Sequence, residues 1–172
     1  MSLSNLGLST LGGKLFVCDA GKAGTESAEY TDITKGLKKT SQPKITRKVR
    51  EDELVDNNGW SVKTALGQSI GDTVINFMRT DDAEEVYSYI KEWALGSTGS
   101  QVIKKDLIQM VPSSTVGTYD VTVTTGFIIE TSLIALDPST GQDYSITFSS
   151  GGEFKRFTGT VNDGKPTLTP VA

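Results

Sequence analysis

Apolar and polar residues alternate over short stretches through most of the chain, which is typical of β-strands with one buried face. Segments rich in glycine, serine and threonine separate these stretches and predict turns. We expect the stretches at 60–66 and 72–79 to pair with each other through a turn at 67–71. The pattern predicts strands at 14–19, 30–33, 44–50, 60–66, 72–79, 102–111, 118–125, 127–136, 144–148 and 153–161.

One segment, 81–95, has the spacing of an amphipathic helix instead. Its apolar residues recur three or four positions apart and define one face, which we expect to pack on a sheet. Asp81 and Glu84 have the spacing of a capping box, and Gly96 is placed to end the helix in the left-handed conformation. The residues expected to pack are Val86, Tyr87, Ile90 and Trp93.

Three further segments predict arms and a loop. Residues 1–12 are uncharged and rich in leucine, and two interpretations remain open: a frayed terminus, or an arm that docks on a neighbouring subunit. Residues 50–60 follow the basic strand at 44–50, reverse its charge and predict a long polar loop beside it. Residues 162–172 contain two prolines and predict an extended C-terminal arm. The leucines of the N-terminal arm are Leu3, Leu6, Leu8 and Leu11.

Length and composition indicate one domain, 1–172, of mainly β (α+β) class with one flanking helix. A chain of 172 residues is long enough for one compact core, and no linker is long enough to divide it. The apolar fraction of 36% is low for such a domain, which suggests that neighbouring molecules bury part of its surface.

The sequence lacks the residue patterns that enzyme active sites commonly use. Histidine is absent, which removes the usual general base and the commonest transition-metal ligand. Glycine clusters lack the lysine of a phosphate-binding loop, and the acidic run 51–56 lacks the ligand spacing of an EF-hand. Cys18 lies in an apolar run and is expected to be a buried core residue. We therefore expect no catalytic residue, no cofactor and no metal.

Charge and hydropathy favour a protein that is made and used in solution, with a cytoplasmic origin. The net charge is −4, so the surface as a whole should not bind DNA tightly. No stretch has the length of a membrane span, and the N-terminus lacks the features of a signal peptide. A basic cluster leaves three uses open: subunit contacts, a solvated face, or nucleic-acid binding. Its members are Lys35, Lys38, Lys39, Lys44, Arg47, Lys48 and Arg50.

Three segments carry a resemblance to a known family: GKLFVCDAG, DNNGWSVKTALGQSIGDTVINFMRTDDAEEVYSYIKEWA and GFIIETSLIALDPSTGQDYSITFSSGG. Together with the order of elements, they make the chain similar to the major tail tube proteins of siphophages. The resemblance covers nearly the whole chain. It implies a β-sandwich or barrel-like fold, whose copies close into hexameric rings that stack into the tube of a phage tail.

The resemblance also implies a role and partners. The protein would be a structural part of the virion tail, assembled in the host cytoplasm, and its tube would conduct DNA from the capsid during ejection. Its partners would be its own copies and the tail terminator, tape measure and tail tip or baseplate proteins.

In that family a long early loop crosses to the adjacent ring, and terminal arms seal rings together. Here the loop is 40–60, and the arms contain the leucines of 1–12 and the segment 167–172. The charged residues that would make the inter-subunit contact are Lys44, Arg47, Lys48, Arg50, Glu51, Asp52, Glu53 and Asp56.

A channel that passes DNA without binding it needs a polar wall that is poor in lysine and arginine. Two strands present rows of small polar residues that fit such a wall, and we expect these rows to line the lumen. The rows contain Thr118, Asp120, Thr122, Thr124, Ser145 and Thr147.

Two other functions remain open. A tube subunit of a contractile injection or type VI-like secretion system would share the fold and the ring. A β-sandwich that binds a receptor or a glycan would share the composition, although exposed aromatic platforms are scarce in this sequence.

Overall fold

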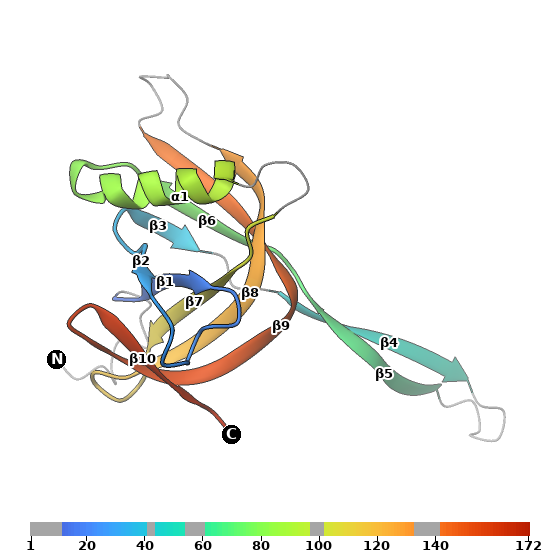
Figure 1. Ribbon diagram of the computed structural model, residues 1–172. Coiled ribbons are helices and arrows are strands. Elements are labelled where there is room, and N and C mark those ends of the chain that lie inside the picture. The colour runs from blue at the N-terminus through green and yellow to red at the C-terminus, as the bar shows by residue number, and fades with distance from the viewer. Residues whose placement is uncertain (1–11, 41–43, 54–60, 97–101, 133–141) are drawn as a thin grey trace.

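The computed structural model describes residues 12–40, 44–53, 61–96, 102–132 and 142–172. An eight-stranded antiparallel sheet curls into a half-barrel, with one helix against it and one hairpin projecting from it (Figure 1). The sheet order is β2-β1-β7-β8-β9-β6-β3, and β10 pairs with β9. The expected fold class, mainly β with one flanking helix, is confirmed.

The elements agree with most of the expected strands, but some expected strands merge. One continuous strand replaces the pair expected at 118–125 and 127–136, and another replaces the pair at 144–148 and 153–161. Register shifts near Gly126 let both strands continue through the glycines, because a bulge absorbs extra residues within a ladder. The elements are β1 (Lys14–Asp19), β2 (Thr31–Asp32), β3 (Leu37–Thr40), β4 (Ile45–Glu53), β5 (Ser61–Ile70), β6 (Thr73–Met78), η3 (Asp81–Ala83), α1 (Glu84–Gly96), β7 (Lys105–Pro112), β8 (Tyr119–Ser132), β9 (Asp143–Asn162) and β10 (Lys165–Pro170).

The core lies on both sides of β1, which explains its uninterrupted apolar run. Leu15 and Val17 belong to a main cluster that also contains residues of α1, β6 and the first part of β9. Phe16 and Cys18 belong to a second cluster with residues of β7, β8 and the later part of β9. A strand that is buried on both faces needs apolar residues at consecutive positions.

The helix packs on the main cluster through the expected apolar stripe. Val86, Ile90 and Trp93 are buried, and Tyr87 is partly buried against the same cluster. Burying each such side chain contributes about 2 kcal/mol. The Trp93 Nε1–H donates to the Ile103 carbonyl at 3.2 Å, which ties the helix to the segment before β7. In the described ranges, no helix is long and apolar enough to cross a membrane.

The ends of the helix differ from the expected caps. A single turn of 3-10 helix precedes α1, and Thr80 at its N-cap makes no side-chain capping bond. The Glu84 carboxylate accepts from the Arg79 guanidinium instead of completing a capping box with Asp81. Gly96 is the last residue of α1 and does not have a positive φ.

Within the segment 40–60, the strand expected at 44–50 is confirmed as β4, which continues into the acidic residues expected in the loop. Ile45–Glu53 forms β4 and pairs with β5 over nearly its whole length. The expected pairing of 60–66 with 72–79 is wrong, because β5 pairs with β4, while β6 pairs with β3 and β9. Only residues 51–53 of β4 were expected in the loop, because their three consecutive acidic residues lack the alternation of a strand that faces the core.

The expected C-terminal arm is also largely a strand. A two-residue turn at Asp163 and Gly164, both with positive φ, returns the chain so that β10 pairs with the end of β9. Such a turn matches the twist of a hairpin. The chain therefore ends against its own sheet.

Candidate assembly surfaces

The β4–β5 hairpin projects from the body of the molecule as a separate two-stranded sheet (Figure 1). Every side chain described at 44–50 and 63–69 is exposed. Three of them are large and apolar: Ile45 is 43% exposed, Val49 54% and Leu66 63%. A lone two-stranded hairpin is marginally stable in water, so exposed apolar side chains on it indicate a surface that a partner covers.

The hairpin presents different chemistry on its two faces. Because side chains alternate along β4, Ile45 and Val49 share one face with Arg47, and Lys48 and Arg50 lie on the other. A partner can therefore contact two apolar side chains with Arg47 between them on one side of the hairpin, and a basic strip on the other.

A second surface is the outer side of the sheet where β6, β9 and β8 meet. Ile75 of β6 and Ile146 of β9 point into the main core, so their neighbours along each strand point outward. All of these outward side chains are at least partly exposed, and none is a lysine or arginine. We call this surface the open face, and it consists of Val74, Asn76 and Met78 of β6, Asp143, Ser145, Thr147 and Ser149 of β9, and Glu130 and Ser132 of β8. Lys38 of β3 reaches the open face through its contact with Asp143.

The sheet that carries the open face ends in two free edges. β7 pairs with β8 only as far as Gly126, so no described strand pairs with the outer edge of residues 127–132. At the other side, β3 pairs with β6 and with no other described strand. Unpaired backbone groups along such edges are ready to pair with a strand of another molecule.

The edge of β10 is protected by contrast. Asn162 and Lys165 flank the two-residue turn and form a hydrogen-bonded pair, so alternate residues of β10 turn their N–H away from β9. Pro166 and Pro170 occupy two of these outward positions and have no N–H to offer. Strand addition is therefore disfavoured at β10 and possible at β3 and β8.

The six residues expected in the lumen do not form one surface. Thr122 pairs with Gln109, which pairs with Leu15 of the main core, so Thr122 lies on the core side of the sheet. Ser145 and Thr147 lie on the opposite, open face. Thr124 is only 4% exposed, beside Leu107 of the core, whereas Asp120 on the same row is exposed.

Thr118 lies apart from both rows, in the turn between β7 and β8. Its hydroxyl donates to the Thr115 carbonyl at 2.8 Å and is 2.5 Å from the Ser113 hydroxyl. These hydrogen bonds give the Thr118 side chain a structural role in stabilising the turn.

Of the residues expected in the inter-subunit loop, Lys44, Arg47, Lys48 and Arg50 are exposed on or next to the hairpin. Glu51, Asp52 and Glu53 end strand β4. Asp56 and the four arm leucines, Leu3, Leu6, Leu8 and Leu11, lie outside the described residues.

One member of the basic cluster has a structural partner. Lys38 on β3 contacts the Asp143 carboxylate on β9 at 2.7 Å and so bridges the intervening strand β6. Both side chains are 45% exposed, and a pair so exposed contributes at most about 1 kcal/mol.

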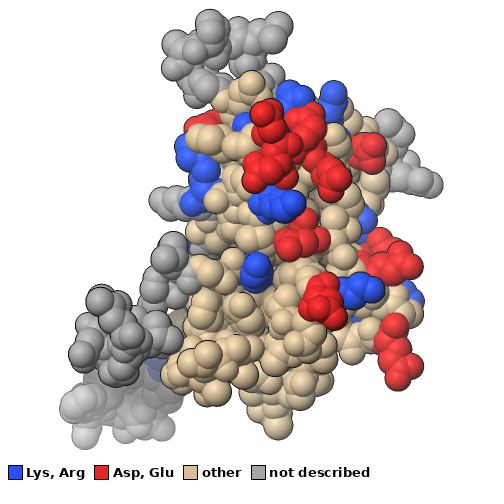
Figure 2. Space-filling model, turned by 90° about the vertical axis from the view of Figure 1, so that its left-hand side faces the viewer, with Lys and Arg blue, Asp and Glu red and all other residues tan. Residues whose placement is uncertain are grey.

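Acidic side chains gather near the start of the helix. Asp81, Asp82, Glu84 and Glu85 lie in its first turns, where negative charge offsets the helix dipole. In Figure 2, acidic side chains cluster on the upper part of the face, and its lower part is largely uncharged. The hydrogen bonds from Arg79 lower the pKa of Glu84, so this carboxylate has a structural role.

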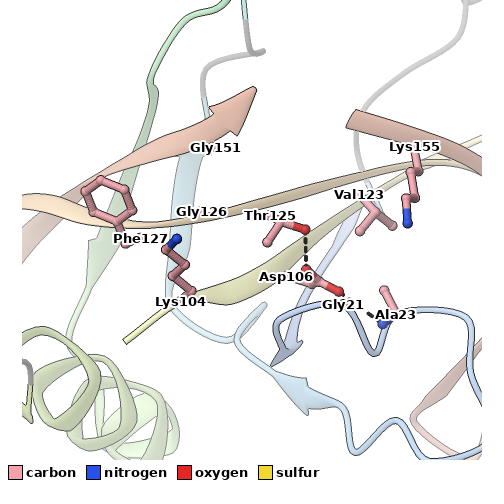
Figure 3. A pocket seen from close by; sticks show the side chains of 10 residues that line it. All are labelled: Gly21, Ala23, Lys104, Asp106, Val123, Thr125, Gly126, Phe127, Gly151 and Lys155. Atoms are coloured by element: carbon pink, nitrogen blue, oxygen red, sulfur yellow. Dashed lines mark hydrogen bonds between the residues drawn. The ribbon is translucent and has the colours of Figure 1, made fainter. Parts of the chain in front are cut away.

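A cavity of about 360 Å³ lies beside the free edge of β8, where β7 begins. Asp106 is buried there, and its two carboxylate oxygens accept from the Thr125 hydroxyl at 2.5 Å and the Ala23 N–H at 3.1 Å (Figure 3). Lys104 and Lys155 lie on opposite sides of Asp106 (Figure 3). No spacing in the sequence pointed to this cavity, because segments far apart along the chain supply its lining.

Metal-ligand clusters and cysteine reactivity can be assessed in the part of the chain that the structure describes. Among the described residues, no group of three or more cysteine, aspartate or glutamate side chains could hold a metal ion. Cys18 is buried, and burial together with the nearby Asp106 raises the pKa of its thiol to about 12. The thiol therefore stays protonated and unreactive at neutral pH.

Comparison with known proteins finds similarity to a solved structure but no matching family model or curated protein. No family model matches the chain, and no curated protein matches it. Among solved structures, the chain is similar to the crystal structure of Hcp1 from Salmonella typhimurium, with 10% sequence identity, 91% of each chain covered and a TM-score of 0.40. We draw no functional conclusion from a similarity of this size.

Proposed function

We propose that this chain is a non-enzymatic structural subunit whose copies close into hexameric rings, and that the rings stack into a hollow tube. One observation carries the proposal: a single sheet has an open, largely polar face and a free strand at each edge. Joining the β8 edge of one copy to the β3 edge of the next uses two different surfaces, so the contact repeats around a ring until it closes.

The strand directions support this contact. Neighbouring strands are antiparallel throughout the series β8, β9, β6 and β3, so β8 and β3 run in opposite directions. Copies related by rotation about the tube axis share one orientation. The β3 strand of one copy and the β8 strand of the next would therefore also be antiparallel, and the ladder would continue unbroken around the ring.

The chemistry of the open face supports a channel for DNA. Ring closure through these edges would turn the open face either inward or outward, and we assign it to the lumen. Ser145 and Thr147 then contribute to the wall, together with Asn76, Ser132 and the acidic Glu130. The open face carries no lysine or arginine from β6, β8 or the first part of β9, and Lys38 of β3, which reaches it, is paired with Asp143. Such a wall offers the phosphate backbone little free positive charge.

The lumen therefore contains only part of the set expected from the sequence. Asp120, Thr122 and Thr124 lie on the core side of the sheet, and we assign them no place in the wall. The projecting hairpin would supply the contact between stacked rings, through the exposed Ile45 and Val49 on one face and Lys48 and Arg50 on the other.

In its finer form, the proposal is a siphophage tail tube that conducts DNA during ejection and contacts tail terminator, tape measure and tail tip proteins. The virion tail would be its location. The alternative is a tube subunit of a contractile injection or secretion system, and co-purification with a sheath protein would identify it.

Analytical ultracentrifugation over a concentration series tests the ring contact. The protein should sediment as a hexamer or larger, whereas Ile129→Lys should remain monomeric, because a charge at the β8 edge opposes strand addition. Val116→Lys is the matched control, because Val116 is also exposed and lies in a turn away from both free edges. Equal assembly of both variants would refute edge pairing. A monomer that binds a receptor or glycan specifically would favour a binding module instead.

A further inference from the structure

The cavity beside β8 carries an unbalanced positive charge. It is lined by Lys104 and Lys155 and by one acid, Asp106, which gives two positive charges against one negative. Both lysines are exposed, and neither pairs with an acidic side chain in the part of the chain that the structure describes. The Asp106 carboxylate already accepts hydrogen bonds from the Thr125 hydroxyl and the Ala23 N–H. The cavity can therefore accept an additional anionic group between its lysines.

Glycines leave the cavity open to another chain. At Gly126 an added Cβ would lie 1.9 Å from the Ser149 carbonyl oxygen, so only glycine allows β8 and β9 to approach there. Gly21 and Gly151 also line the cavity and are exposed. Gly126 is itself buried, so a strand or hairpin end would reach the backbone at the exposed Gly21 and Gly151, which carry no side chain.

The β4–β5 hairpin carries charge of the matching sign at its far end. β4 begins in a basic stretch and ends in Glu51, Asp52 and Glu53. Nine residues of strand place this acidic end about 30 Å from the start of β4. A hairpin of that length extends well beyond its own subunit, as its direction in Figure 1 shows.

We propose that the cavity between Lys104 and Lys155 receives the acidic end of the β4–β5 hairpin, Glu51–Glu53, from a second copy of this chain in the adjacent ring. This inference rests on the proposed stacking of rings and adds the docking site. Each ion pair is weak when it is exposed, but every subunit of a ring repeats it, so the contacts reinforce one another. Attraction between the two lysines and the acidic residues would also fix the position of the hairpin end in the cavity.

Charge reversal at both ends tests the docking site, with electron microscopy to count rings and tubes. Lys104→Glu with Lys155→Glu should leave rings intact and reduce the mass of tubes about tenfold or more. Glu51→Lys with Glu53→Lys should have the same effect. The chain that carries all four changes should form tubes again, because the charges are exchanged rather than removed.

The control is Lys91→Glu, which reverses an exposed lysine on α1 and should leave tube formation unchanged. Circular dichroism should show that all variants retain the fold. Normal tubes from either double variant, or failure of the fourfold variant to recover them, would overturn the docking site. If the lysines instead hold phosphate, inorganic phosphate would bind the wild-type monomer and be lost with Lys104→Glu, which would also overturn it. Absence of rings in the wild type would contradict the proposed function itself.

Discussion

Thr122 and Ser145 lie on opposite faces of the same curled sheet. Thr122 shares the face of Leu15 and the main core, whereas Ser145 alternates with the buried Tyr144 and Ile146 and points outward. Both residues belong to rows of small polar side chains that look equivalent in the sequence. Only one of the two rows can line a channel formed by the open face.

The first prediction follows from this difference. A cysteine at Ser145 should react with a bulky maleimide in the monomer and become protected in assembled tubes, because the reagent cannot enter the lumen freely. A cysteine at Thr122 should show no such change on assembly. The native Cys18 should contribute no background, since it is buried and its thiol pKa is about 12. Equal labelling of the Ser145→Cys variant before and after assembly would place the open face outside the lumen.

A second prediction concerns Gly126. The Gly126→Ala variant should lose about 2 kcal/mol or more of unfolding free energy, because the new methyl group would overlap the Ser149 carbonyl and force the backbone apart. Gly71→Ala is the control, since its nearest atom would lie 3.4 Å away. Urea denaturation followed by circular dichroism measures both. A Gly126→Ala variant as stable as the control would show that β8 and β9 do not approach so closely.

A third prediction concerns pH. Arg79 lowers the pKa of Glu84 below its ordinary value of 4.5, so ionised Glu84 favours the folded state. This contribution is complete above the ordinary pKa and is lost as pH falls through the lowered, folded-state pKa. Glu84→Gln should therefore lower the Tm at pH 7, and its difference from the wild type should vanish in strong acid.

Glu85→Gln is the control for that experiment. Glu85 lies in the same turn, is exposed, and pairs with no basic side chain among the described residues. Its substitution should change the Tm little at any pH. A Glu84→Gln difference that persists unchanged at low pH would contradict the ion pair.

A fourth prediction concerns Tyr144, which stacks on Phe77 with ring centroids 5.1 Å apart. Burial raises the pKa of its hydroxyl to about 12, and the hydroxyl has no hydrogen-bond partner among the described residues. Tyr144→Phe should keep the stacking and stabilise the fold by about 1 kcal/mol, because it removes an unsatisfied buried polar group. Thr125→Val, by contrast, should destabilise the fold, because the buried Asp106 carboxylate would lose the hydroxyl group that donates a hydrogen bond to it. Thermal unfolding distinguishes the two outcomes, and a destabilised Tyr144→Phe would reveal a partner for the hydroxyl.

The elements that could be predicted from the sequence are those with a core to face. The 3.6-residue spacing of the helix and the apolar run of β1 reflect burial directly. Apolar side chains are stabilised where they are removed from water, so the positions that face the core are apolar. The alternation in β9 likewise identified Ser145 and Thr147 as residues on a polar face.

The elements that were missed have no core or break a local rule. The strand at 44–50 was expected, but its continuation through Glu51–Glu53 was not, because three consecutive acidic residues resemble a loop. β10 contains Pro166 and Pro170, which argue against a strand except at an edge. The cavity around Asp106 could not be found either, since Ala23, Thr125 and Lys155 meet only through the pairing of distant strands.

Negative-stain electron microscopy of the purified protein over a concentration series tests the central claim most directly. The account predicts hollow rings with six-fold symmetry, which stack into tubes as the concentration rises. Monomers at every concentration, with and without a tail tip complex to initiate assembly, would contradict it.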